Sequence, residues 1–136
     1  MDNMSRRGFD PLTYRFEDQA PERGEVTEVA EGCFWARMPI GGRLNHINVW
    51  LLRDGEGWTI VDTGLFGEHT QGHWRGIFEN YLDGKPVTRV IATHLHNDHT
   101  GNAGWICQEG GCELWMSRSG FYMCKVMAAD GPSDVP

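Results

Sequence analysis

The chain has 136 residues, of which 40% are hydrophobic and 23% are charged, and its formal net charge at pH 7 is −7. These values are typical of one globular domain and exclude a disordered chain, while the negative charge and the scattered basic residues argue against nucleic-acid binding. No apolar run approaches the roughly 20 residues that a transmembrane helix requires, and the N-terminal residues lack the apolar segment of a signal peptide, so we expect a cytoplasmic protein without membrane association.

Residues 1–24 combine prolines and glycines with charged residues and show no hydrophobic periodicity. We expect them to form a flexible N-terminal arm. The domain itself is expected to cover residues 25–130, followed by a tail over residues 131–136.

A β-meander is expected at the start of the domain, because apolar-rich runs alternate there with turn residues such as Asp54-Gly55-Glu56-Gly57. The predicted strands cover residues 26–29, 33–38, 46–53 and 58–62. Helix and strand units follow. Apolar residues at i, i+3, i+4, i+7 and i+8 from Trp74 predict an amphipathic helix that ends at Asp83-Gly84. Strands are then expected over residues 87–93 and 112–116, and helices over residues 101–108 and from the capping residue Ser117 to about Ala129. This order predicts an α+β fold, with helices on one face of a sheet.

Three histidines and one aspartate stand together in the segment His94-Leu95-His96-Asn97-Asp98-His99, directly after the strand expected over residues 87–93. Neutral imidazole and carboxylate groups suit a borderline divalent ion such as zinc. Side chains at i and i+2 of an extended strand converge on one ion only if the backbone curls, and Thr100-Gly101-Asn102 permits such a turn. A solvated polar loop is the alternative interpretation.

The motif His94-x-His96-x-Asp98-His99, preceded by Thr59-Ile60-Val61-Asp62-Thr63-Gly64, resembles the metallo-β-lactamase superfamily of metal-dependent hydrolases. That superfamily includes glyoxalases, lactonases, lactamases and RNA-processing nucleases. The resemblance covers residues 25–130 and implies half of an αββα sandwich, namely its N-terminal half.

The resemblance also implies a ligand set. His94 and His96 would hold one divalent ion, and Asp98 and His99 would hold a second. Zinc is the expected metal, with iron or manganese as alternatives. The ions would activate a bridging hydroxide, and Asp98 would act as a catalytic residue that orients the hydroxide or transfers its proton.

Asp62 ends an apolar strand, where an unpaired carboxylate would be costly to bury. By resemblance it lies beside the metal loop and accepts a hydrogen bond from a ligand or a loop amide. A simple turn or cap within Asp62-Thr63-Gly64 is the alternative.

The superfamily completes its sites with a histidine, an aspartate and a final histidine downstream, but no histidine follows His99 in this chain. Three explanations are considered. The chain is a fragment of a longer protein, another protomer or chain donates the missing ligands, or the remnant binds metal poorly and does no chemistry. The first is preferred, and the uncovered core surface that it implies would favour self-association.

Other histidines and the cysteines are assigned more ordinary roles. His69 and His73, four residues apart on the predicted helix, are interpreted as surface residues, and His46 as a core-edge or pocket residue. All four cysteines are expected to be free thiols in a reducing compartment; a disulfide between Cys107 and Cys112, which flank a Gly110-Gly111 turn, is the alternative for that pair.

Function is therefore predicted as metal-dependent hydrolysis of a small ester, thioester, lactone or amide. The alternatives are a non-catalytic metal-binding or interaction domain and, less favoured by the charge, an RNA-processing nuclease.

Overall fold

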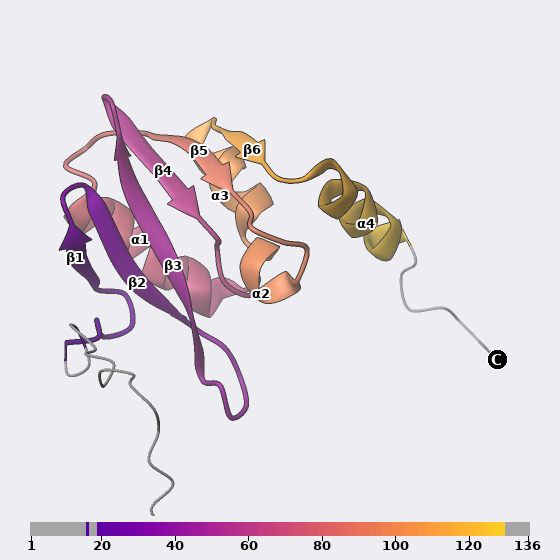
Figure 1. Ribbon diagram of the computed structural model, residues 1–136, viewed down its shortest axis with the longest axis horizontal. Coiled ribbons are helices and arrows are strands. Elements are labelled where there is room, and N and C mark those ends of the chain that lie inside the picture. Colours follow the sequence, from indigo (N-terminus) through magenta and orange to yellow (C-terminus); the bar gives the residue numbers. More distant parts are fainter. Residues whose placement is uncertain (1–15, 17–18, 130–136) are drawn as a thin grey trace, which may run out of the picture.

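The computed structural model describes residue 16 and residues 19–129 (Figure 1). Most of the predicted arm over residues 1–24 lies outside these residues, as does the predicted tail over residues 131–136. At the described end of the arm, Pro21 is buried, and its carbonyl oxygen accepts a hydrogen bond from Nε of Arg37 over 2.7 Å.

Six strands form one mixed sheet, in the order in which they occur along the chain. The first four strands pair in antiparallel fashion, and β5 and β6 then add in parallel. Their bounds are β1 Val26–Ala30, β2 Cys33–Pro39, β3 His46–Asp54, β4 Gly57–Val61, β5 Val87–Ile91 and β6 Glu113–Trp115. The predicted meander and the α+β fold class are confirmed.

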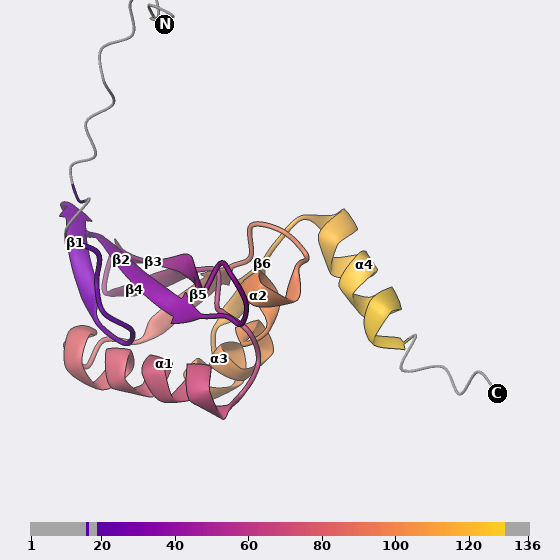
Figure 2. The ribbon, with the colours of Figure 1, turned by 90° about the horizontal axis from the view of Figure 1, so that it is seen from below.

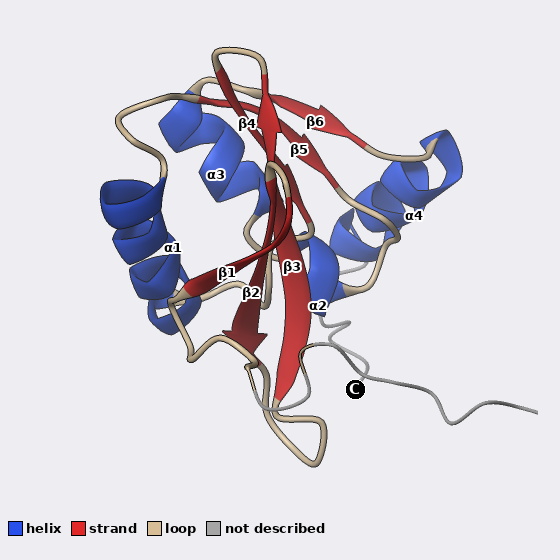
Figure 3. Cartoon of the chain, turned by 60° about the vertical axis from the view of Figure 1, so that its left-hand side comes forward, coloured by secondary structure: helices blue, strands red, loops and turns tan. Residues whose placement is uncertain are grey.

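Helices connect the parallel strands, as the sequence order predicted. Helix α1 (Glu68–Tyr81) joins β4 to β5, and the short α2 (Asn97–Thr100) and α3 (Ala103–Gly110) join β5 to β6. Figure 2 shows α1 and α3 against the same face of the sheet. Helix α4 (Arg118–Ala129) follows β6 and stands beyond that edge of the sheet (Figures 2 and 3). Its first turn is capped by Ser117 as predicted, because the Ser117 hydroxyl accepts a hydrogen bond from the Gly120 amide over 3.1 Å.

The core lies between the sheet and the pair α1 and α3. Alternate residues of β3 (Ile47, Val49 and Leu51) point into it, as a half-buried strand requires. Two tryptophans fill its centre, and the indole N–H of each donates a hydrogen bond to a main-chain carbonyl oxygen. Trp58 donates to the Leu82 oxygen over 3.1 Å, and Trp74 donates to the Thr63 oxygen over 2.8 Å. The second bond ties helix α1 to the segment that follows β4.

The opposite face of the sheet carries an apolar row that crosses five strands. Cross-strand pairs join its members in the sequence Trp35, Trp50, Val61, Ile91 and Trp115. In β2 to β5 these residues alternate with residues of the core, so they point away from α1 and α3, and Trp115 pairs with Ile91 on the same side. Figure 2 shows no described helix over the strands on this side, and Trp115 is 50% exposed. We refer to this row as the open face.

Two local features depart from expectation. A single helix was expected over residues 101–108, but the structure has α2 and α3, which are separated at Gly101-Asn102. The chain turns helical already at Asn97, inside the histidine segment, and the buried Asn102 leaves helical geometry (φ −101°, ψ 5°) to bond the segment after β4.

Within the described residues, no helix has the length and apolar character needed to cross a bilayer.

Candidate metal centre

The histidine segment and Asp62 meet at one edge of the sheet. Strands β4 and β5 are parallel and pair Val61 with Ile91, so their carboxyl ends lie side by side. Asp62 follows β4 directly, and its amide donates to the Ile91 oxygen over 2.9 Å. The segment from His94 to His99 follows β5, stays extended as far as His96 and then turns into α2.

Asp62 is the most heavily bonded side chain at this edge. It is only 4% exposed. Its Oδ1 atom accepts the Thr93 amide over 2.8 Å, and its Oδ2 atom accepts the Thr93 hydroxyl over 2.8 Å and Nδ1 of His99 over 2.8 Å. A buried carboxylate is tolerated here because each oxygen has a donor. The left-handed backbone at Asp62 (φ 61°) turns the chain at the end of β4.

The bond to Asp62 fixes the ring of His99. Since Nδ1 donates its proton to the carboxylate, the lone pair of the neutral ring lies on Nε2. That nitrogen is 3.6 Å from Oδ2 of Asp98. The Nε2 lone pair and a carboxylate oxygen, both suitable metal donors, therefore lie next to each other.

Asp62 also acts on His94, through Thr93. The Thr93 hydroxyl gives its proton to Asp62, so its oxygen is free to accept from Nδ1 of His94, 3.0 Å away. This arrangement again leaves the lone pair on Nε2. The Nε2 atom of His94 lies 3.1 Å from Nδ1 of His96. Two nitrogens on one tetrahedral zinc ion, each at about 2.0–2.1 Å, are separated by about 3.3 Å, so this pair has the spacing of a chelate.

The donor set is incomplete among the described residues. No group of three or more His, Cys, Asp or Glu side chains in residues 16 and 19–129 is placed to hold one ion. The donors form two pairs instead, His94 with His96 and Asp98 with His99. Their chemistry fits a divalent metal, but a catalytic zinc site usually has three protein ligands, so these pairs make up part of a site.

A hydrogen-bond network that the sequence did not reveal supports the histidine segment. The amide and hydroxyl of Thr63 both donate to the His99 oxygen, over 2.8 and 2.9 Å. The Asn102 side chain, fully buried, donates to the carbonyls of Thr63, Gly64 and Leu65. At Gly101 a Cβ would lie 2.4 Å from the Phe66 nitrogen, so only glycine allows this close approach.

The two other predicted surface histidines lie on α1, apart from the histidine segment. Nε2 of His69 and Nε2 of His73 are 3.3 Å apart and bond each other. Burial lowers the pKa of His73, with further contributions from His69 and Arg23.

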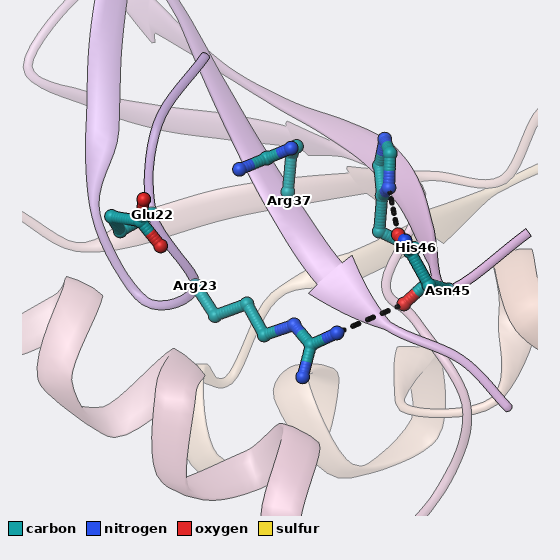
Figure 4. Close-up of a pocket in the computed structure, with 5 residues that line it drawn as sticks. All are labelled: Glu22, Arg23, Arg37, Asn45 and His46. Carbon is teal, nitrogen blue, oxygen red and sulfur yellow. Dashed lines mark hydrogen bonds between the residues drawn. The ribbon is translucent and has the colours of Figure 1, made fainter.

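His46 lines a pocket, which agrees with the interpretation of it as a pocket residue. The pocket has a volume of about 390 Å³ and is lined also by Glu22, Arg23, Arg37 and Asn45 (Figure 4). Burial lowers the pKa of His46, and the positive charges of Arg37 and Arg23 lower it further. The lining is polar and mixed in charge, and nothing in it groups His46 with a second metal donor.

Comparison with known proteins gives a consistent result. A family model described as the metallo-beta-lactamase superfamily matches residues 42–125. A beta-lactamase domain protein from Burkholderia ambifaria has 46% sequence identity and a TM-score of 0.81, over 85% of this chain and 37% of that one. None of the curated proteins matches the chain.

More distant solved structures share the fold. A metallo-beta-lactamase from Pontibacter korlensis has 22% identity and a TM-score of 0.61, over 82% of this chain and 50% of that one. A metallo-beta-lactamase from Hirschia baltica has 18% identity and a TM-score of 0.60, over 76% and 48%. The chain therefore spans half or less of the length of these three proteins.

Proposed function

The chain belongs to the metallo-β-lactamase superfamily, and from this premise we propose that it provides one half of the metal centre of a hydrolase that acts on a small ester, thioester, lactone or amide. The observation that carries the proposal is the placement of Asp62. One buried carboxylate orients His99 directly and His94 through Thr93, and it leaves Nε2 of both rings free for a metal. Structural histidines do not need matched orientation of this kind, whereas metal ligands depend on it.

Each residue has a distinct role in this proposal. His94 and His96 hold one divalent ion, and Asp98 and His99 hold a second. When bound, such ions lower the pKa of a coordinated water to about 7 and polarise the scissile carbonyl. Asp98 orients the water and accepts its proton, while Asp62 and Thr93 keep the imidazoles in the required tautomers.

We propose zinc as the metal, with iron or manganese as the alternatives, because all three accept mixed nitrogen and oxygen donors. The remaining ligands are proposed to come from a longer form of the protein or from another chain. The share of the related structures that this chain covers, 37% to 50%, supports this part of the proposal.

A small, non-nucleic-acid substrate fits the charge of the chain. A net charge of −7 repels a phosphate backbone, and RNA binding depends on clustered lysines and arginines. We propose a cytoplasmic location on the basis of the sequence.

A non-catalytic metal-binding domain is the second candidate function. The observation in its favour is that each donor pair has only two members among the described residues. Such a domain would bind metal without turning over substrate.

Turnover measurements on metal-loaded protein separate the two candidates. In a preparation that also contains the missing ligands, we expect hydrolysis of at least one member of a panel of thioesters, lactones and aryl esters. Asp98→Asn should lower kcat by at least about 100-fold, because general-base and hydroxide-orienting groups contribute about 10²–10⁴-fold. Asp54→Asn is the matched control, since Asp54 lies at the other end of the β3–β4 hairpin. Stoichiometric metal without turnover of any substrate, in a preparation that also contains the missing ligands, would favour the binding domain.

A further inference from the structure

Helix α3 ends in a motif that brings two cysteines together. Gly111 has a left-handed backbone (φ 62°), and its amide donates to the Cys107 oxygen. The amide of Cys112 donates to the same oxygen over 3.2 Å. The bond from the Cys112 amide is the 6→1 bond of a Schellman helix ending, in which the side chains at the positions of Cys107 and Cys112 normally make an apolar contact.

Thiols take the place of that apolar contact in this chain. The side chains of Cys107 and Cys112 lie next to each other, and both are half-buried against the core. The other two cysteines are elsewhere. Cys33 begins β2, and Cys124 lies on α4, where its thiol bonds the Leu95 oxygen over 3.6 Å.

The cysteine pair is separate from the candidate metal centre. Gly110 lies against Val87, the first residue of β5, since a Cβ on Gly110 would be 3.6 Å from the Val87 Cβ. The histidine segment follows the opposite end of the same strand. The thiols are therefore at the far edge of the sheet and take no part in the donor pairs described above.

We propose that Cys107 and Cys112 form a site of reversible oxidation, at which a hydroperoxide converts the two thiols into an intramolecular disulfide that links the end of α3 to the start of β6. Nothing in this proposal depends on the proposed hydrolase function.

The reaction balances with one hydroperoxide. The Cys112 thiolate attacks the terminal peroxide oxygen, which forms an S–O bond, breaks the O–O bond and releases an alcohol or water. Cys107 then attacks the Cys112 sulfur, which forms the S–S bond and expels hydroxide, and the proton of Cys107 converts that hydroxide into water. Two thiols are oxidised, and one peroxide is reduced.

The environment of the pair decides which cysteine attacks first. Burial, together with the neighbouring Cys112 thiol, raises the pKa of Cys107 to about 12. Cys107 therefore keeps its proton, and we assign the attack on the peroxide to Cys112. Cys107 serves as the resolving thiol.

Peptide mapping of the native, full chain tests the proposal directly. The sequence has four cysteines, and trypsin cleaves after Arg89 and Arg118, so Cys107 and Cys112 fall on one peptide while Cys33 and Cys124 fall on two others. After limited treatment with hydrogen peroxide, we expect free thiols to fall from four to two. The peptide over residues 90–118 should become lighter by the mass of two hydrogens, about 2 Da, and dithiothreitol should restore it.

Matched single variants provide the controls. Cys112→Ser should abolish the mass change and leave Cys107 unoxidised at the same peroxide dose, and Cys107→Ser should stop the reaction at Cys112 sulfenic acid, detectable with dimedone. Cys33→Ser should leave the disulfide unchanged. Disulfide between chains, oxidation confined to Cys33 or Cys124, or a mass for peptide 90–118 that does not change would overturn the proposal.

Discussion

The buried carboxylate of Asp62 accepts a hydrogen bond from Nδ1 of His99 over 2.8 Å. Two residues that are far apart in the sequence are thereby joined at the edge where β4 and β5 end. The bond decides which nitrogen of His99 keeps a lone pair, so it links the fold of the sheet to the chemistry of the histidine segment.

Asp62→Asn tests this link. Asparagine has one acceptor oxygen, so its side chain cannot accept from both the Thr93 amide and Nδ1 of His99, and the network that holds the two rings in their tautomers is broken. We expect zinc affinity to fall by about 10- to 100-fold, the usual cost of losing an outer partner of a metal ligand. Competition with a chromogenic chelator measures the change. Asp54→Asn, which alters bonds from Thr59 and Arg89 far from the histidine segment, should leave affinity unaltered.

Thr93 is predicted to matter through its hydroxyl alone. Thr93→Val keeps the shape of the side chain but removes the bridge between Asp62 and His94. Zinc affinity should therefore fall in Thr93→Val and be retained in Thr93→Ser. Equal affinity of the two variants would show that the bridge does not orient His94.

Close packing at Gly101 gives a stability prediction. In Gly101→Ala the new Cβ would meet the Phe66 nitrogen, the Asn97 oxygen and the Gly64 oxygen, all closer than 3.0 Å. We expect the free energy of unfolding to fall by about 1–3 kcal/mol, as overpacking usually costs, and more if the backbone cannot shift. Gly104→Ala, where nothing lies within 4 Å, should instead be stabilising by up to about 1 kcal/mol, because alanine favours the helix. Urea denaturation of both variants measures the contrast.

Self-association through the open face follows from its apolar row of residues. Trp50 is the second residue of that row, between Trp35 and Val61. We expect the chain to form oligomers in analytical ultracentrifugation, and Trp50→Lys to shift them toward monomer. Leu44→Lys replaces a 64% exposed residue of the β2–β3 loop and should have no effect. A wild-type chain that sediments as a monomer at every concentration would refute this expectation.

Much of the fold follows from patterns in the sequence. Strands β2 to β5 lie where alternating or continuous apolar runs were found, and Asp83-Gly84 ends α1, since both residues have left-handed backbone angles. The residue at which α1 begins could not be predicted from the sequence. Its N-cap is Gly67, which offers no side-chain hydrogen bond, and its first turn is polar. Helix α2 was missed for a related reason, because it is four residues long and formed by the histidine segment itself.

The metal donors of the candidate site could be predicted from the sequence, but the residues that hold those donors in place by hydrogen bonds could not. Three histidines and a carboxylate in one short segment stand out in any sequence. Thr63, Thr93 and Asn102 do not, because their roles depend on carbonyl and carboxylate groups brought near by tertiary structure. Only Asp62, at the end of an apolar run, gave a signal that a buried polar group needed a partner.

A zinc titration of the metal-free chain tests the central claim most directly. We predict that the chain binds zinc, that His94→Ala/His96→Ala loses the ion assigned to that pair, and that His69→Ala/His73→Ala binds as much zinc as the wild type, although His69 and His73 also bring two nitrogens within 3.3 Å. Calorimetry gives stoichiometry and affinity, and tryptophan fluorescence confirms that each variant is folded. Equal zinc binding by the folded His94→Ala/His96→Ala variant and the wild type, or no binding by the wild type, would contradict the account.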